Sequence, residues 1–246
     1  MIKIIFAYTS LFLFCTTMAI AAEQQFESDK IKTSGGDLII TFIGHGTLMM
    51  SWGGKIIHVD PVLGEADYSK LPKADLIIIT HEHSDHFDLR AIDLVKMAKT
   101  KIVANENVAK QLSKIIMMKN GDIQILEGFR IEAVPAYNIE HMRTPGVPFH
   151  PKGAGNGYIV TFGDKRVYIA GDTENTPEMK KLTGIDIAFL PMNLPYTMTP
   201  EMVADAAKSF RPKILYPYHY GNTNIPTFLD LLKGETAIEV RIRKMQ

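Results

Sequence analysis

Short apolar runs recur along the chain and predict its strands. Residues 38–43, 74–80 and 185–190 are dense in β-branched and other apolar side chains, which is typical of strands buried inside a protein. The pair Gly53-Gly54 separates two further runs and predicts a tight hairpin. The remaining predicted strands are residues 47–52, 55–59, 101–104, 122–126, 129–134, 158–162, 166–170, 213–216 and 237–241.

Segments with apolar residues at helical spacing alternate with these strands. Residues 88–98 give a clear example, because Leu89, Ile92 and Val95 fall on one face of a helix. Residues suited to cap a helix precede two of the other segments. The other predicted helices are residues 106–113 after Asn105, residues 200–210 after Thr199, and residues 227–232.

The order of these elements predicts the fold class. Strand pairs precede strand–helix units in the first half of the chain, and the second half repeats that order. This repetition predicts an α/β protein, a four-layer αββα sandwich with the helices outside. We expect one domain over residues 37–246, because apolar runs recur there without a linker. Residues 23–36 are polar and aperiodic, and we expect a flexible lead-in.

Residues 1–22 have the pattern of a secretory signal peptide. Lys3 precedes a mostly apolar run, and the small residues Ala21 and Ala22 offer a cleavage site. An uncleaved membrane anchor is the alternative, which the small residues disfavour. Cleavage would remove Cys15, the single cysteine, so nitrogen and oxygen atoms must hold any metal in the mature chain. We therefore expect export, to a bacterial periplasm, and no membrane span after cleavage.

Charge narrows the class of partner. The sequence has 27 basic and 27 acidic side chains and a formal net charge of zero. It contains no basic stripe and no interleaving of basic with aromatic residues, so a nucleic acid partner is not expected. A small-molecule substrate is the expected partner.

A histidine-rich cluster directly after the apolar run at residues 74–80 is the strongest chemical signal. Residues 81–86 read His-Glu-His-Ser-Asp-His, so three imidazoles and an aspartate lie where a strand ends. A strand end is a rigid position from which to aim ligands, and this donor set suits Zn²⁺, Mn²⁺ or Fe²⁺. The alternative is a polar loop that is histidine-rich by chance, and the density of the cluster argues against it.

Two later residues can join this cluster. Asp172 follows a predicted strand after Gly171, which permits a sharp backbone turn. Its carboxylate can bridge two metals, or it can cap a helix at residues 173–181. His219 follows another predicted strand and lies between two tyrosines, where plain packing is the alternative to metal binding.

Together these motifs resemble the metallo-β-lactamase superfamily. The His-x-His-x-Asp-His motif, the later Gly-Asp-Thr and the final histidine occur in order between about residue 38 and the C-terminus. Gly44-His45-Gly46, the Gly-Gly hairpin, Asp60-Pro61 and residues 195–198 are similar to one branch. That branch includes ascorbate-6-phosphate lactonase-like proteins and N-acyl phosphatidylethanolamine phospholipase D-like phosphodiesterases. The resemblance implies a hydrolase with two divalent metal ions, zinc being the first candidate.

The resemblance also implies a ligand set. The family places a third histidine of the first site where this chain reads Pro135-Ala136-Tyr137-Asn138. His141 and His150 are the next imidazoles; we favour His150 and keep His141 as an alternative ligand or a substrate contact. The other implied ligands are His81 and His83 for the first metal, Asp85, His86 and His219 for the second, and Asp172 as the bridge.

Other polar residues are candidates for supporting roles. Asp60, at a strand end before Pro61, can hold a ligand imidazole through its second nitrogen, although a plain turn is an alternative. We expect His45 behind the ligands or facing the substrate. Lys152 and Arg143 can meet an anionic group, or can be solvated loop charges.

The expected reaction is hydrolysis of an ester, lactone or phosphodiester by a hydroxide that the metals activate. Asp85 is the expected catalytic residue, which orients the hydroxide or takes its proton. Two alternatives remain. One is an iron-dependent oxidoreductase on the same scaffold, and the other is a non-catalytic metal-binding protein, which only the displaced third histidine supports.

Overall fold

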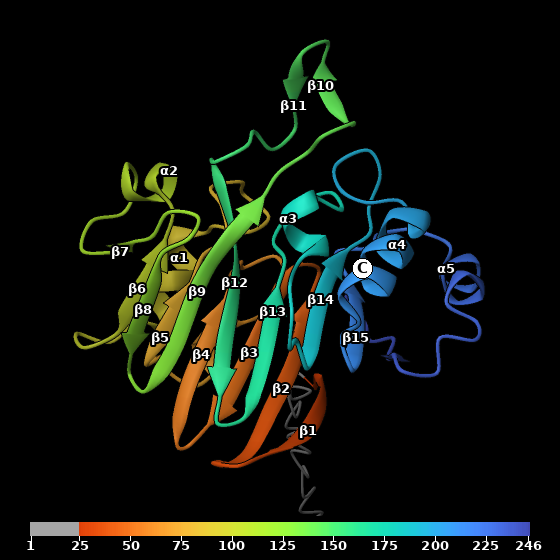
Figure 1. The fold of residues 1–246 in the computed structure, drawn as a ribbon. Coiled ribbons are helices and arrows are strands. Elements are labelled where there is room, and N and C mark those ends of the chain that lie inside the picture. The colour runs from red at the N-terminus through yellow and green to blue at the C-terminus, as the bar shows by residue number, and fades with distance from the viewer. Residues whose placement is uncertain (1–24) are drawn as a thin grey trace, which may run out of the picture.

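Two seven-stranded sheets packed face to face form the centre of the molecule (Figure 1). The structure is a computed structural model that describes residues 25–246, so the predicted signal peptide lies outside the described residues. Helices lie on the outer sides of the two sheets, and the predicted αββα sandwich is confirmed. The first sheet holds, in spatial order, β1 (Glu27–Thr33), β2 (Gly36–Gly44), β3 (Thr47–Trp52), β4 (Lys55–Val59), β5 (Leu76–Ile78), β6 (Lys101–Ala104) and β7 (Ile116–Met117).

The second sheet repeats the topology of the first. In each sheet a run of antiparallel strands continues into parallel strands, from β4 onward in the first and from β13 onward in the second. The second sheet holds, in spatial order, β16 (Glu239–Val240), β15 (Ile214–Tyr218), β14 (Ile187–Pro191), β13 (Lys165–Ile169), β12 (Gly155–Phe162), β9 (Phe129–Ala136) and β8 (Ile123–Leu126). Carboxyl ends of neighbouring parallel strands meet at one edge of a sheet, which is a common position for a functional site.

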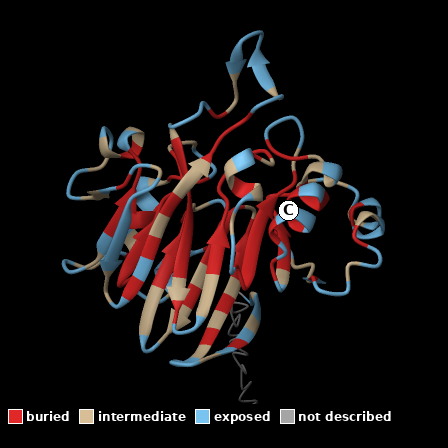
Figure 2. Cartoon of the chain, in the orientation of Figure 1, coloured by how far each residue is buried: buried red, intermediate tan, exposed pale blue. Residues whose placement is uncertain are grey.

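The apolar pattern of β5 shows how the layers pack. Leu76 and Ile78 point into the core between the sheets, while Ile77 packs in a second cluster with Ile92 and Val95 of α1. Side chains alternate between the two faces of a strand, so a strand buried on both faces is apolar throughout. Buried segments accordingly run through the middle of both sheets (Figure 2).

Two helices are shorter than the sequence pattern predicts, whereas α4 (Pro200–Phe210) has the predicted bounds. Residues 88–98 and 106–113 were each expected to be helical, but only their first parts are. Leu89, expected on the packed face, is 43% exposed, and Ala91 packs there instead. The helices are η1 (Tyr68–Lys70), α1 (Leu89–Val95), α2 (Glu106–Ala109), α3 (Pro177–Lys180), α4 (Pro200–Phe210) and α5 (Ile225–Leu231). Within the described residues, no helix combines the length and apolar character needed to cross a membrane.

The expectation of a flexible lead-in at residues 23–36 is wrong for most of that segment. Residues 27–33 form β1, which pairs with β2 along its whole length. Ile31 is the one buried residue of β1, so the strand lies at the sheet edge and shows almost no apolar alternation. Backbone pairing, which composition does not reveal, orders this segment.

A two-stranded hairpin outside both sheets was also not expected. It consists of β10 (Met142–Thr144) and β11 (Val147–Pro148), and it projects from the rest of the molecule (Figure 1). Nearly all of its residues are exposed (Figure 2). The chain enters the hairpin after β9 and leaves it at Phe149 and His150.

Candidate metal centre

Most of the predicted ligands lie at the carboxyl ends of parallel strands, and His150 joins them from the loop before β12. Residues 81–86 follow β5, Asp172 follows β13, and His219 follows β15. Asp60 follows β4, and His45 follows β2 in the same sheet. The loops of the two sheets are also joined, because the backbone N–H of His219 donates to the carbonyl of His45 at 3.0 Å. Residues far apart in the sequence therefore meet at one edge of the sandwich.

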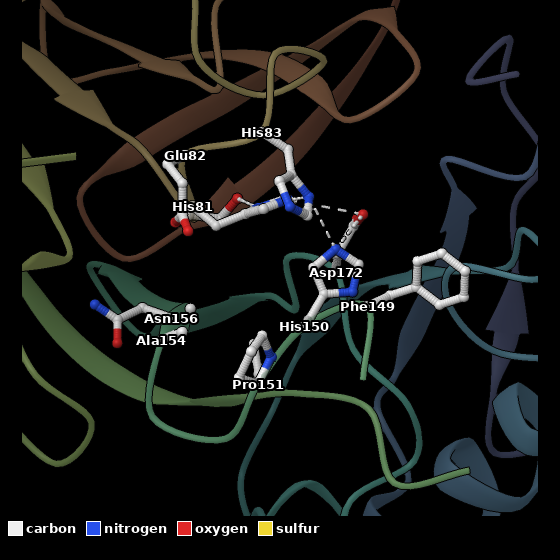
Figure 3. Close-up of a pocket in the computed structure, with 12 residues that line it drawn as sticks. His81, Glu82, His83, Phe149, His150, Pro151, Ala154, Asn156 and Asp172 are labelled. Atoms are coloured by element: carbon white, nitrogen blue, oxygen red, sulfur yellow. Dashed lines mark hydrogen bonds and ion pairs between the residues drawn. The ribbon is translucent and has the colours of Figure 1, made fainter. Parts of the chain in front are cut away.

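Three imidazoles form the first group. His81 Nε2 lies 3.1 Å from His83 Nδ1, and His150 Nε2 lies 3.2 Å from the same atom. His81 and His150 are buried, and the three ring nitrogens converge on one point beside Asp172 (Figure 3). The arrangement is that of three nitrogen donors around a single cation.

His150, and not His141, completes this group. The backbone N–H and Nδ1 of His150 lie 2.8 and 2.7 Å from Asn138 Oδ1. Asn138 Nδ2 donates to Glu174 Oε1 and to the carbonyl of Tyr196, so its oxygen must face His150 and accept the Nδ1 proton. His150 Nε2 therefore carries the lone pair. His141 instead places Nδ1 2.7 Å from Glu174 Oε1.

The second group contains His45, Asp85, His86 and His219. Asp85 Oδ2 lies 3.3 Å from His45 Nε2 and 3.5 Å from His219 Nε2. The rings of His45 and His219 have centroids 3.7 Å apart. From the sequence, His45 was expected behind the ligands or facing the substrate. In the structure its ring nitrogen belongs to the second group, and all donor atoms of that group lie within 4.8 Å of one another.

Asp172 lies between the two groups. Its Oδ1 is 3.3 Å from His86 Nε2, and its Oδ2 is 3.3 Å from His150 Nε2 and 3.5 Å from His219 Nε2. The helix that Asp172 was alternatively expected to cap begins later, at Pro177, and Thr176 caps it. Asp172 therefore has the position of a bridging carboxylate between two donor groups.

Asp60 supports an imidazole of each group from behind. His86 Nδ1 donates to Asp60 Oδ2 at 2.8 Å, and the hydroxyl of Thr80 donates to the same oxygen at 2.6 Å. Thr80 Oγ1 then accepts from His81 Nδ1 at 3.0 Å. Both rings are thus held through Nδ1, which leaves each Nε2 free to face the centre. The role proposed for Asp60 from its strand-end position agrees with these contacts.

Buried polar atoms without partners show that the residues fit a cation. Within the described residues, His86 Nε2, Asp172 Oδ1 and both ring nitrogens of His219 are buried and make no well-directed hydrogen bond, although His86 Nε2 and Asp172 Oδ1 lie 3.3 Å apart. An unsatisfied buried polar atom costs about 1–3 kcal/mol, so the three of these atoms that face the centre, His86 Nε2, Asp172 Oδ1 and His219 Nε2, call for a ligand. Imidazole nitrogen and carboxylate oxygen are donors for Zn²⁺, Mn²⁺ and Fe²⁺.

The electrostatics of the centre also favour positive charge. Burial opposes ionisation of Asp172, yet His219 and His86 hold the pKa of its carboxyl well below the usual range. Burial, together with His86, lowers the pKa of His81, so this imidazole is neutral at pH 7 and can act as a donor. For His86, Asp172 and Asp60 outweigh burial and raise the pKa well above its usual value.

The backbone at the site is locally strained. His45, Asp60 and His219 have φ values of 47°, 46° and 48°, in the left-handed region that side chains other than glycine rarely adopt. Strain of this kind is often found at functional sites. A Cβ at Gly46 would lie 2.5 Å from the ring of His86, so glycine is required for the turn to pass that ligand.

The two groups open into a cavity of about 420 Å³. Its wall includes His45, Asp85 and His219, together with three residues of the loops above the site: Arg143, Phe149 and Tyr196. The ring of Phe149 points away from the cluster of His81, His83 and His150 (Figure 3). The site can therefore hold a small molecule beside the candidate ligands.

Sequence reasoning missed the supporting residues Asn138, Glu174 and Thr80. Glu174 is fully buried and accepts hydrogen bonds from the backbone N–H groups of residues 139, 140 and 141. One signal was available, because Asn138 ends the segment in which the family pattern has a histidine. As a polar residue at that position, Asn138 was a candidate for contact with His150, the imidazole that takes the place of the family's histidine.

Comparisons with known proteins identify the family of this chain. A family model for the beta-lactamase superfamily domain matches residues 39–219. A UPF0173 metal-dependent hydrolase of Thermococcus kodakarensis is 35% identical over 195 residues, which cover 74% of this chain and 84% of the relative.

Solved structures give the same result. A candidate metal-dependent hydrolase from Parabacteroides distasonis is 54% identical, with a TM-score of 0.86, and the match covers 90% of this chain and 100% of that chain. Igni18, a metallo hydrolase from Ignicoccus hospitalis, is 25% identical with a TM-score of 0.68, over 85% of this chain and 95% of that chain. The chain therefore belongs to the beta-lactamase superfamily and, within it, to the UPF0173 family of metal-dependent hydrolases.

Proposed function

We propose that this protein is a dinuclear metal hydrolase that cleaves an ester, lactone or phosphodiester. Its family supports metal-dependent hydrolysis. The observation that carries the proposal is the convergence of two donor groups on either side of Asp172, with buried ring nitrogens left unpaired. His81, His83 and His150 would hold one metal, and Asp85, His86 and His219 the other, with Asp172 between them.

The donor set favours zinc. With Cys15 outside the predicted mature chain, imidazole and carboxylate groups are the donors, and these suit Zn²⁺, with Mn²⁺ or Fe²⁺ as alternatives. A bound divalent metal would lower the pKa of water and polarise a carbonyl or phosphoryl oxygen. His45 reaches the second group as well, and we propose that it contacts the substrate or completes that group.

Asp85 is the proposed catalytic residue. Its side chain is 50% exposed and borders the cavity, so it can contact both water and substrate. Burial opposes its ionisation, but the imidazoles of His219 and His45 hold its pKa below the usual range. Asp85 is therefore a carboxylate at neutral pH, the form that can orient a water molecule through a hydrogen bond.

We also propose that the protein is exported to a periplasm after cleavage behind Ala21 or Ala22. The basic start, the apolar run and the small residues before Glu23 support this proposal. Expression of the full chain in a bacterium, followed by fractionation and N-terminal sequencing, tests it. A mature N-terminus at Ala22 or Glu23 in the periplasmic fraction is expected, and an intact Met1 in the cytoplasmic fraction would contradict export.

Hydrolysis itself is tested with zinc-loaded protein and a panel of 4-nitrophenyl esters, γ-lactones and bis(4-nitrophenyl) phosphate. We expect turnover of at least one class, and a loss of about 100-fold or more in His83→Ala, which removes a donor. His141→Ala is the matched control and should retain turnover. Protein that binds only iron and consumes oxygen during turnover would instead identify an oxidoreductase.

A further inference from the structure

We propose that the substrate is an anion with a flat apolar group, bound between Arg143, Phe149 and Tyr196. This inference rests on the proposed hydrolase function and names the substrate class for the same site. Arg143 would pair with an anionic oxygen of the substrate, while its apolar group packs on the two aromatic rings. Acidic aryl esters, such as aryl phosphodiesters, have this chemistry.

Arg143 supplies the charge for this recognition. Among the described residues that line the cavity, it alone carries a permanent positive charge. None of the described carboxylates forms an ion pair with it, whereas Lys152, the other loop cation considered, lies 2.8 Å from Glu178 Oε1. The planar guanidinium can bind a phosphate or carboxylate through two hydrogen bonds at once. Metal ions at the centre would neutralise Asp85 and Asp172, which would otherwise repel an anion.

Two aromatic rings form the apolar wall. Phe149 and Tyr196 lie edge to face, with ring centroids 5.1 Å apart and an interplanar angle of 77°. The guanidinium of Arg143 lies 5.6 Å from the centroid of the Phe149 ring. A cation beside an aromatic wall favours ligands that combine a negative charge with a flat apolar part.

This wall has a fixed position relative to the candidate ligands. Phe149 directly precedes His150, and Asn138 binds both His150 and the carbonyl of Tyr196. Asn138 thus connects His150 of the first group to the chain segments that carry Phe149 and Tyr196. A substrate packed on these rings would be held in register with the reacting centre.

Exposed apolar side chains also occur on the two chain segments that carry Arg143, Phe149 and Tyr196. Ile139, Met142 and Val147 of the hairpin segment are 44, 39 and 49% exposed, and Leu194 beside Tyr196 is 49% exposed. Large exposed apolar residues on two adjacent loops are typical of a binding surface.

Calorimetric titration of the zinc-loaded protein tests this proposal without turnover. The probes are benzylphosphonate, methylphosphonate and benzyl alcohol, which separate the anion from the ring. Benzylphosphonate should bind about tenfold more tightly than methylphosphonate, as expected for one aromatic group packed on two rings. Tyr196→Ala, at an exposed position, and the milder Phe149→Leu should each reduce this preference.

Arg143→Gln should weaken binding of both phosphonates about tenfold, the effect of one lost charge-assisted interaction, and leave benzyl alcohol unaffected. Arg90→Gln, at an 81% exposed arginine on α1, is the matched control and should change nothing. Equal affinities for the two phosphonates, or unchanged phosphonate binding in Arg143→Gln, would overturn the proposal. Discrimination among the probes without turnover of any ester would retain this inference and reject the proposed hydrolase function.

Discussion

At the scale of single residues, the centre depends on which nitrogen of each imidazole is held. Asp60 holds His86 and, through Thr80, His81, while Asn138 holds His150. In all three rings Nδ1 is the bonded atom, and Nε2 faces the other candidate ligands. Because only a deprotonated nitrogen can bind a metal, these contacts select the tautomer that metal binding requires.

Replacement of Asn138 by alanine should therefore weaken the first metal site. Loss of its oxygen frees the ring of His150 to rotate, and we expect a 10- to 100-fold loss of affinity for one of the two metals, as is typical for such supporting contacts. Competition with a chromophoric zinc chelator measures this affinity. Asn222→Ala, at an exposed asparagine, is the control. Unchanged affinity in a folded Asn138→Ala protein would show that His150 needs no such support.

His58 gives a prediction for stability against pH. This histidine is fully buried, its Nε2–H donates to the carbonyl of Pro72 at 2.9 Å, and Nδ1 has no partner. Burial lowers its pKa from 6.5 to about 4, despite that hydrogen bond. The folded state therefore binds the proton less readily than the unfolded state does, and stability is lost as pH falls from 6.5 through 4.

The neutral variant His58→Gln should flatten this pH dependence. The shift in the pKa of His58 corresponds to about 3 kcal/mol. The difference between the unfolding free energies of the two proteins should therefore change by about that amount between pH 7 and pH 4. Urea titrations at each pH, with metal removed from both proteins, measure it. Parallel curves for the two proteins over this range would contradict a buried, neutral His58.

At the scale of elements, turns at the strand ends bring the ligands together. The turn between β2 and β3 passes so close to His86 that a Cβ at Gly46 would lie 2.5 Å from its ring. The ring of His86 is buried and held by Asp60, so it has little room to move. The sequence around this turn is therefore constrained by packing as well as by its backbone.

Gly46→Ala should destabilise the protein by about 1–3 kcal/mol, the usual effect of adding atoms to a packed interior. Denaturant titration of metal-free protein measures this loss separately from metal binding. Gly64→Ala is a matched control, because a Cβ at Gly64 would meet only Val62, at 4.0 Å. Equal stability of Gly46→Ala and the parent protein would show that the turn and His86 can move apart.

Much of the element order could be predicted from the sequence, and the errors have physical reasons. Runs such as residues 74–80 identify strands because both faces of β5 are buried. β1 was missed because only Ile31 of that strand is buried, and backbone pairing carries the rest. The hairpin of β10 and β11 is almost wholly exposed, so it leaves no apolar pattern to detect.

At the scale of the whole molecule, ion pairs fasten the C-terminal segment to the first strand. The carboxylate of Asp29 on β1 lies 2.7 Å from a guanidinium nitrogen of Arg243 and 3.1 Å from one of Arg241. It also accepts a hydrogen bond from the hydroxyl of Tyr216 on β15. This part-buried cluster joins β1 of the first sheet to the second sheet and to the chain end.

Asp29→Asn should loosen this connection. Two guanidinium groups would lose a partner that is only 12% exposed, and we expect a loss of about 1–3 kcal/mol in unfolding free energy at pH 7. Thermal and urea unfolding measure it. Asp37→Asn is the control, because Asp37 pairs with the exposed Lys30 and Lys32, and such surface pairs contribute little. Similar losses in the two variants would contradict a special role for Asp29.

The candidate site was predictable where its residues are close in sequence. Residues 81–86 mark the centre by density alone, and Asp172 and His219 follow strands that the apolar pattern reveals. The choice between His141 and His150 was not predictable, because it depends on Asn138 and Glu174, which fold the intervening loop back onto the centre. Such tertiary hydrogen bonds leave no periodic signal in a single sequence.

Metal stoichiometry tests the central claim, that two donor groups sharing Asp172 hold two metals. The parent protein, His150→Ala and His141→Ala would each be folded and dialysed against trace zinc. The zinc content per chain would then be measured by inductively coupled plasma mass spectrometry. We expect two zinc ions in the parent protein and in His141→Ala, and one in His150→Ala. One zinc ion or none in the parent protein, or a loss in His141→Ala instead of His150→Ala, would contradict it.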